Sequence, residues 1–392
     1  MNVAPEQLGL WYVRDKPLPD ELLSSWITHL AWNHGLKYQN FCFLNWGRSS
    51  VAEHGDIDRR APEAVLATLR ARTGATEAQV RQTTLQSLVG VLFESLATRG
   101  HVSGLYSRSV RTGGRVVHFR YQYCAACLRA DEHPYVRKVW RLSLFVCCAR
   151  HAELLQDRCA NCCAPYVPSR FAKGYRGRVS ERNHPITHCW NCRTDLSALG
   201  GRRARADEMR FVALVHRGIA HGWVQLEDQL IHAMSYVEGV RVLTLLLTRA
   251  RRGERLVAQF ERVGLLLPRD DVGRLDFDRL DVVSRRSVVR ALEVLLREWP
   301  SNYVAWLQAA GVSSSYVNDI RRGKRAIPFW LAKPTYDSLY RKHYQPSDGE
   351  ITNAQNWLLR TGPANDVALA GLLNVSGVRR KWSRQNRNVP GL

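Results

Sequence analysis

Most of the ten cysteines in this chain stand in pairs that are separated by two residues. The pairs are Cys124 with Cys127, Cys148 with His151, Cys159 with Cys162, and Cys189 with Cys192. Two intervening residues let both side chains of a pair turn toward one tetrahedral metal ion. Four such pairs predict two four-coordinate zinc sites, with all eight residues as ligands.

The spacing allows two ways of combining the pairs. The simpler one is sequential and joins the first pair with the second and the third with the fourth. A cross-braced arrangement, first with third and second with fourth, also fits and stays open. In either case four protein ligands leave no coordination position for a catalytic water, so we expect both ions to be structural.

Other thiols and imidazoles lie near the pairs without sharing their spacing. Cys147 and Cys163 stand directly beside ligands, but the two-residue spacing favours Cys148 and Cys162. Cys42 is expected to be a buried thiol. His184 and His188 precede the fourth pair, and they are left out of the ligand set because isolated histidines are more often hydrogen-bonded or exposed.

Residues 304–323, VAWLQAAGVSSSYVNDIRRG, have the layout of a helix-turn-helix, with Gly311 at the turn. The second helix and its basic flank offer side chains that can contact phosphates and base edges: Ser314, Ser315, Asn318, Arg321, Arg322, Lys324 and Arg325. The alternative is a packing unit of three helices that never contacts DNA. A weaker echo of the pattern spans residues 367–382.

The elements that must position these residues are predicted to be mainly helical. Residues 17–35 have Asp20 as a candidate N-cap, apolar residues at helical spacing and Gly35 as a stop. Thr76 and Gln79 form a capping-box pattern. Periodic segments recur at 211–224, 237–250 and 282–299.

We therefore expect a mainly α protein in three parts. Residues 1–115 form an N-terminal helical region, and residues 116–200 form a central double zinc-binding module of the zinc ribbon or knuckle kind. Residues 201–392 form a C-terminal helical region that contains the helix-turn-helix.

Charge and hydropathy limit the partners. Lys and Arg number 57 against 35 Asp and Glu, which gives a formal charge of +22. This excess indicates a polyanionic partner, with nucleic acid as the first candidate; the alternative is arginine usage set by a GC-rich genome. We expect no signal peptide and no membrane partner, and hence a cytoplasmic protein in which thiols favour metal over disulfides.

Motifs for catalysis are missing. The sequence has no GxxxxGK[ST], HExxH or GxSxG pattern. Carboxylates such as Asp131, Glu132, Asp270 and Asp271 have no spacing that singles them out. We therefore expect no enzyme, although a DNA-processing enzyme with dispersed carboxylates stays open as an alternative.

The region of the first three pairs resembles the signature of the TniQ family, which includes the TnsD-like target selectors. The matching residues are Cys124, Cys127, Leu128, Asp131, Tyr135, Trp140, Arg141, Cys148, His151, Leu154, Leu155, Cys159 and Cys162. The segment DELLSSWITHLAWNHG and residues 73–85 are also similar to the family. Ala125 replaces the usual proline of the first knuckle and Cys163 the usual glycine after the third pair, and neither is a ligand.

The resemblance implies a non-catalytic targeting adaptor that links a chosen DNA site to an AAA+ transposition regulator and, through it, to the transposase. Some family members bind an attachment site directly. Others act as homodimers on an RNA-guided CRISPR effector of the Cascade type, whose guide RNA supplies the sequence specificity. The sequence does not separate these two modes, and a stand-alone zinc-containing transcriptional regulator is a further alternative.

Overall fold

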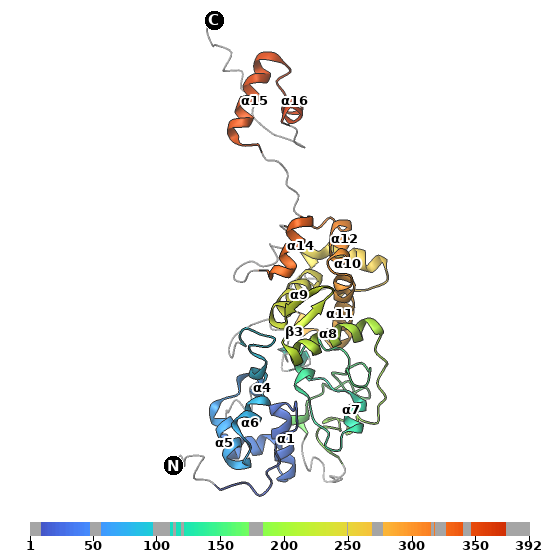
Figure 1. The fold of residues 1–392 in the computed structure, drawn as a ribbon. Helices are drawn as coiled ribbons and strands as arrows, with labels where there is room; N and C mark the ends of the chain where they lie inside the picture. The colour runs from blue at the N-terminus through green and yellow to red at the C-terminus, as the bar shows by residue number, and fades with distance from the viewer. Residues whose placement is uncertain are drawn as a thin grey trace. The chain divides into compact units, whose positions relative to one another are not determined.

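The computed structural model describes residues 9–47, 56–96, 110–112, 115–118, 121–171, 183–248, 250–268, 277–314, 317, 327–339 and 346–373. The chain divides into two compact units, Met1–Leu339 and Tyr340–Leu392. Helices dominate both units, which confirms the mainly α prediction (Figure 1). None of the helices in these ranges is long and apolar enough to cross a membrane.

The N-terminal helices are α1 (Leu23–Asn33), α2 (Tyr38–Trp46), α4 (Ile57–Arg60), α5 (Glu63–Thr73) and α6 (Glu77–Gln82), followed by the 3-10 turn η2 (Leu85–Leu88). They pack around a core of their own that includes Trp26, Leu30 and Phe41. The predicted capping box of Thr76 and Gln79 is present at the start of α6. Gly35, with φ +75°, follows α1 as predicted.

The expected N-cap of the first helix was wrong. The helix begins at Leu23, and its N-cap residue is Leu22 rather than Asp20. Asp20 has a left-handed φ of 62°, and its carbonyl accepts a hydrogen bond of 2.9 Å from the backbone N–H of Lys138. The residue therefore belongs to the contact with the central module.

The described residues of the central module form little regular structure. It contains the hairpin strands β1 (Val110–Thr112) and β2 (Arg115–His118), the helix α7 (Ala125–Ala130), and the turns η3 (Lys138–Arg141) and η4 (Pro168–Arg170). With so few helices and strands, the loops that carry the cysteine pairs make up most of this region. Closely packed loops of this kind need internal cross-links, and metal ions can provide them.

The C-terminal part of the first unit consists of α8 (Ala206–His221), the antiparallel hairpin β3 (Trp223–Leu226) and β4 (Gln229–His232), α9 (Ala233–Thr248), α10 (Ala250–Arg262), η5 (Phe277–Arg279), α11 (Val282–Leu296), α12 (Ser301–Ala309) and α14 (Phe329–Leu339). The helices α8, α9 and α11 confirm the three periodic segments predicted from the sequence. They bury Phe211, Val240 and Leu292.

One hydrophobic core crosses from the central module into these helices. It includes Phe145 of the module, Phe211 of α8 and Val288 of α11. Polar contacts add to it, because the backbone N–H of Val282 donates to the Asp157 carboxylate over 2.8 Å. The central module is therefore packed as part of the first unit.

The predicted helix-turn-helix is described only in its first half. Helix α12 is followed by Gly311, the predicted turn residue, with φ +66°, and Leu307 and Val317 are buried. Residues 315–316 and 318–326 lie outside the described residues, so the motif as a whole stays a prediction. Ser314 is 5% exposed, so the exposed hydroxyl expected there is not found.

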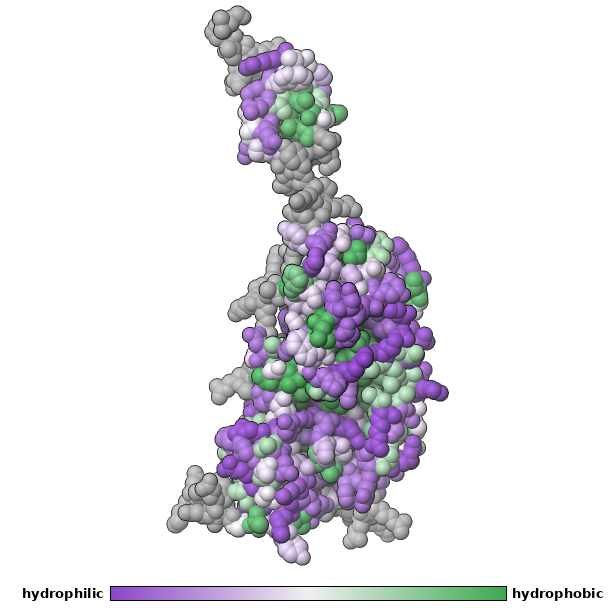
Figure 2. Space-filling view, in the orientation of Figure 1, coloured by the Kyte–Doolittle hydropathy of each residue, from purple (hydrophilic) through white to green (hydrophobic). Residues whose placement is uncertain are grey.

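The second unit is described as two helices, α15 (Asp348–Thr361) and α16 (Asp366–Leu372). Ser347 and Asn365 cap them through side-chain oxygens. Hydrophobic residues gather on the face of this unit seen in Figure 2, and Leu359 and Val367 are exposed. The weaker echo at 367–382 falls partly on α16 and, from residue 374, outside the described residues.

Candidate metal centres

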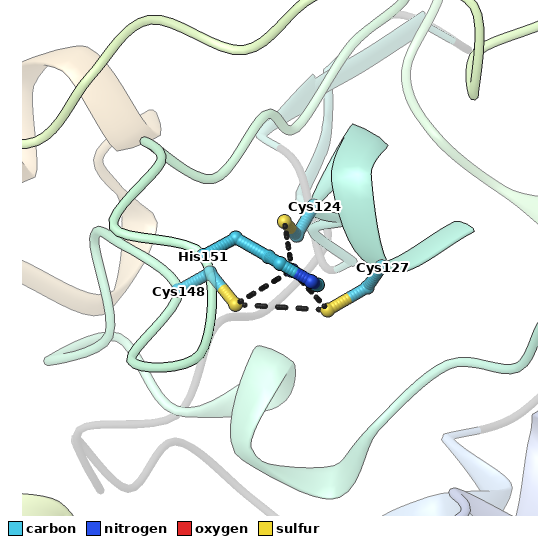
Figure 3. Close-up of side chains that lie close together, drawn as sticks. All are labelled: Cys124, Cys127, Cys148 and His151. Atoms are coloured by element: carbon cyan, nitrogen blue, oxygen red, sulfur yellow. Dashed lines mark hydrogen bonds between the residues drawn. The ribbon is translucent and has the colours of Figure 1, made fainter. Parts of the chain in front are cut away.

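The first two pairs converge on one point. Cys124, Cys127, Cys148 and His151 point toward one another from α7 and from the loop after η3 (Figure 3). The Nδ1 atom of His151 lies 3.6, 3.2 and 3.8 Å from the Sγ atoms of Cys124, Cys127 and Cys148. The Sγ atoms of Cys127 and Cys148 are 3.6 Å apart. We call these four residues the first centre.

These separations are the edges of a small tetrahedron. An ion bound to sulfur at about 2.3 Å and to nitrogen at about 2.0–2.1 Å holds tetrahedral ligands about 3.5–3.8 Å apart. The observed distances lie in or near this range. The first centre therefore has the size and the donor set, three sulfurs and one nitrogen, of a closed four-coordinate metal site.

The third and fourth pairs form a second centre of the same size. The Sγ atoms of Cys159 and Cys192 are 3.7 Å apart, and those of Cys162 and Cys189 are 3.6 Å apart. All four ligand atoms lie within 4.8 Å of one another. The structure thus brings the pairs together sequentially, and the cross-braced alternative is not the arrangement observed.

Three of the four pairs are closed by the same loop. The N–H four residues after the first ligand donates to that ligand's carbonyl, at 2.9 Å for Ala152, 2.9 Å for Cys163 and 3.0 Å for Arg193. Each donor residue has a left-handed φ, of 52°, 57° and 65° respectively. This conformation favours glycine. It explains why the TniQ pattern usually has a glycine at the position that Cys163 occupies here.

The first pair is held differently, by a short helix. Cys124 is the N-cap residue of α7, and the N–H of Leu128 donates to its carbonyl over 3.1 Å. One helical turn then places Cys127 next to Cys124. Ala125 takes the first helical position, where a proline is well tolerated because its missing N–H has no helical partner.

Two asparagines that sequence reasoning missed support the second centre. Asn161 donates to the Sγ of Cys192 over 3.7 Å, and Asn191 donates to the Sγ of Cys162 over 3.6 Å. Each asparagine precedes the second cysteine of one pair and contacts a cysteine of the other. The repeated Cys-x-Asn-Cys pattern was the available signal for this crossed support.

Hydrogen bonding already distinguishes the thiols of the first centre. Hydrogen bonds from Cys124 and Cys127 lower the pKa of Cys148 below its ordinary value. The hydrogen bond with Cys124, followed by that with Cys148 and by burial, raises the pKa of Cys127. Within the first centre the surroundings of Cys148 favour its thiolate, and thiolate is the form of cysteine that binds metals.

The residues excluded from the ligand set lie outside both centres. Cys147 is buried with its Sγ 3.5 Å from the Met209 sulfur, and Cys42 is buried as predicted. Cys163 is exposed. The ring of His184 packs 5.2 Å from that of His29, and burial lowers the pKa of His184 to about 3.

The residues proposed to bind nucleic acid cannot be compared in the same way. Ser314 is buried, and Ser315, Asn318, Arg321, Arg322, Lys324 and Arg325 lie outside the described residues. The structure therefore brings the predicted metal ligands together and leaves the second helix of the motif as a prediction.

Comparison with known families gives one match. The family model described as TniQ matches residues 12–155, a stretch that includes helices α1 to α7 and all of the first centre and ends before Cys159. No curated protein matches the chain. A TniQ domain implies a protein of target selection in DNA transposition. The chain therefore contains a TniQ domain at residues 12–155.

Proposed function

We propose that this chain is a non-catalytic targeting adaptor for DNA transposition. It would link a target DNA site to an AAA+ transposition regulator and, through it, to the transposase. The observation that carries the proposal is the TniQ match over residues 12–155, which contains a complete four-ligand centre. The positive charge of the chain, +22, suits a protein that works beside DNA.

We propose zinc as the metal in both centres. Ligand sets that are rich in sulfur, with separations that fit a tetrahedron, favour zinc among the divalent ions. Cys124, Cys127, Cys148 and His151 would hold one ion, and Cys159, Cys162, Cys189 and Cys192 the other. The protein supplies four ligands at each centre, so the expected contribution of the metal is to folding.

The mode of target recognition has two forms in this proposal. In the favoured form the adaptor reaches its target through an RNA-guided effector of the Cascade type, acting as a homodimer. In the alternative the chain reads an attachment site directly, as TnsD-like proteins do, and the predicted helix that contains Arg321 and Arg322, with Lys324 and Arg325 after it, would contact that DNA.

The experiment that tests the proposal is co-purification from cells that express the chain with and without the AAA+ regulator and the CRISPR effector of its own locus. An electrophoretic shift on random and attachment-site DNA accompanies it. Stable association with the regulator and the effector, and weak salt-sensitive binding to free DNA, supports the RNA-guided form.

Other outcomes separate the alternatives. Association with the regulator and tight, sequence-selective binding to an attachment site without the effector supports the direct reader. Association with neither protein, and selective binding to a promoter instead, contradicts the adaptor and favours a transcriptional regulator. Nicking of plasmid DNA by the purified chain with magnesium contradicts the non-catalytic role.

A further inference from the structure

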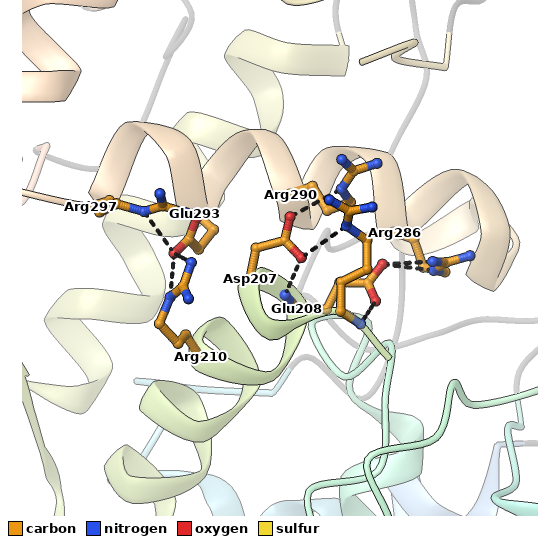
Figure 4. Close-up of polar contacts among 8 residues, drawn as sticks. Asp207, Glu208, Arg210, Arg286, Arg290, Glu293 and Arg297 are labelled. Carbon is orange, nitrogen blue, oxygen red and sulfur yellow. Dashed lines mark hydrogen bonds and ion pairs between the residues drawn. The ribbon is translucent and has the colours of Figure 1, made fainter. Parts of the chain in front are cut away.

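A row of arginines follows the junction of helices α8 and α11 and contributes no ligand to either metal centre. The two helices lie side by side, and their facing edges carry alternating charges (Figure 4). We call the arginines of this row the arginine strip: Arg205, Arg210, Arg286, Arg290 and Arg297. Three carboxylates, of Asp207, Glu208 and Glu293, lie between them.

The carboxylates are too few to neutralise the strip. Glu293 accepts from both Arg210, at 2.7 Å, and Arg297, at 2.6 Å. Asp207 is likewise shared, with Arg290 at 3.2 Å and Arg205 at 3.5 Å. Only Glu208 pairs with one arginine of the strip, Arg286, at 2.8 Å. The five guanidinium groups outnumber these three carboxylates, and the surface keeps a net positive charge even when Glu298, which also attracts Arg297, is counted.

Burial separates the two signs. The side chain of Glu208 is fully buried and that of Glu293 is 7% exposed. The side chains of Arg205, Arg210 and Arg297 are 61%, 52% and 48% exposed. Glu208 and Glu293 therefore lie beneath these guanidinium groups, whereas Asp207 and Arg286 are similarly exposed, at 18% and 19%. The charge that the most exposed side chains of the strip present to solvent is positive.

The same carboxylates fix the arginines in place. A guanidinium held by a carboxylate on one edge keeps other N–H donors for a second partner, because it has five donors and forms bidentate contacts with phosphate. Ordering before binding lowers the entropic cost of binding. Arg217, two turns beyond Arg210 on α8, is also exposed and extends the row of cations.

We propose that the arginine strip binds the phosphate backbone of duplex DNA without reading its sequence. The inference rests on the proposed role at a DNA target and adds the surface that would hold the duplex. Fixed cations on two rigid helices suit the regular phosphates of a duplex.

The test uses the full-length, zinc-loaded protein and fluorescence anisotropy on a random-sequence DNA duplex over a salt series. The double variant Arg210→Gln with Arg297→Gln should weaken binding and reduce the salt slope by about 2, one for each phosphate contact removed. The matched control is Arg70→Gln with Arg81→Gln, which removes the same charge from ion-paired side chains that are 44% and 52% exposed. The control should keep the wild-type slope.

A second variant has the opposite expected sign. Asp207→Asn keeps the side-chain oxygen that accepts the N–H of Glu208 over 2.9 Å, but it removes a negative charge from the strip. It should bind DNA more tightly, with a salt slope steeper by up to about 1. If the double variant does not fold, as judged by circular dichroism, this variant decides, and weaker or unchanged DNA binding overturns the proposal.

Equal loss of duplex binding in the double variant and its control also overturns the proposal. The same anisotropy measurement on single-stranded RNA is a further check, and a loss of binding confined to that RNA overturns the proposal as well. Failure here is separable from failure of the proposed function. A strip variant that binds DNA like its control, in a protein that still associates with the AAA+ regulator, contradicts only the strip. Strip-dependent DNA binding without that association contradicts only the adaptor.

Discussion

The two metal centres have nearly the same size but different positions in the molecule. In the first centre Cys124, Cys127 and Cys148 are buried, and the centre lies within the TniQ match. In the second centre Cys162 and Cys192 are half-buried, and all its ligands lie beyond residue 155. Both centres contribute cysteines to one hydrophobic core. Because the second centre has the more exposed ligands, we expect its loss to disturb the core of the unit less than loss of the first.

The largest effect is expected from a substitution that removes a ligand of the first centre. Cys127→Ser should reduce bound zinc from two ions to one and unfold the first unit, because zinc binding contributes about 10–16 kcal/mol in zinc-finger peptides and a whole domain has about 5–15 kcal/mol of stability. Cys162→Ser should also lose one ion, but it should keep most of the helical signal. Metal content by mass spectrometry and circular dichroism of both variants measure this.

Equal unfolding by both cysteine variants would contradict the comparison. Retention of two ions by either variant would show that the ligand set is wrong.

A smaller effect is expected at the buried arginine that joins the first-centre region to the N-terminal helices. The guanidinium of Arg141 is fully buried between Asp56, at 2.9 Å, and Asp58, at 2.5 Å. Arg141→Met leaves these carboxylates without that cation, and the free energy of unfolding should fall by about 3–5 kcal/mol. Arg158, 34% exposed beside Asp157 and Asp281, is the matched position near the second centre.

Arg158→Met should cost about 1 kcal/mol, because a partly exposed ion pair is screened by water. Chemical denaturation of the two variants compares these costs. A cost at Arg158 that equals or exceeds the cost at Arg141 would contradict the assignment of the tighter coupling to the first-centre region.

A stabilising change is expected in the second centre. Cys163 has a left-handed φ of 57° and is exposed. A non-glycine residue in the left-handed conformation costs about 1–2 kcal/mol, which glycine avoids. Glycine is also more flexible in the unfolded chain, which costs about 0.5–1 kcal/mol of stability. Cys163→Gly should therefore raise the free energy of unfolding by roughly 0.5–1 kcal/mol. The unfolding midpoint should rise while two zinc ions remain. A lower midpoint would mean that the thiol has a stabilising contact of its own.

The smallest effect concerns His29 of α1, which contacts Glu21 and Pro134. His29 contacts the Glu21 carboxylate at 2.9 Å through Nδ1 and the Pro134 carbonyl at 2.9 Å through Nε2. Burial opposes its charge, but hydrogen bonding and attraction from Glu21 dominate and raise the pKa of His29, with a further contribution from Asp15. The neighbouring ring of His184 stays neutral because burial lowers its pKa to about 3.

A raised folded pKa stabilises the protein fully below the unfolded value of about 6.5, and this stabilisation is lost as pH rises through the folded pKa. The stability difference between wild type and His29→Gln should therefore shrink from pH 6 toward high pH. Comparing the two proteins at each pH cancels the titration of the metal ligands. A difference that grows with pH would contradict the account.

The sequence predicted the features that depend on local spacing. The eight residues of the two Cys/His clusters follow from two-residue intervals, and the helices from periodicity and caps such as Thr76. Features that depend on which distant segments meet were not predicted. The order of the metal pairs, the crossed support by Asn161 and Asn191, and the position of Asp20 against Lys138 all require the folded chain.

The arginine strip shows the same limit. Arg210 and Arg297 share Glu293 only because α8 and α11 pack side by side, and nothing in either helix alone identifies the pairing. The left-handed position of Cys163 was visible only indirectly, as a departure from the usual glycine of the TniQ pattern.

The most direct test of the central claim maps transposon insertions in cells that contain the transposase and the AAA+ regulator of the same locus, with and without this chain. The account predicts insertions at a fixed distance from one target when the chain is present, and loss of that targeting when it is absent or carries Cys127→Ser. Unchanged targeting in cells that lack the chain would contradict the account.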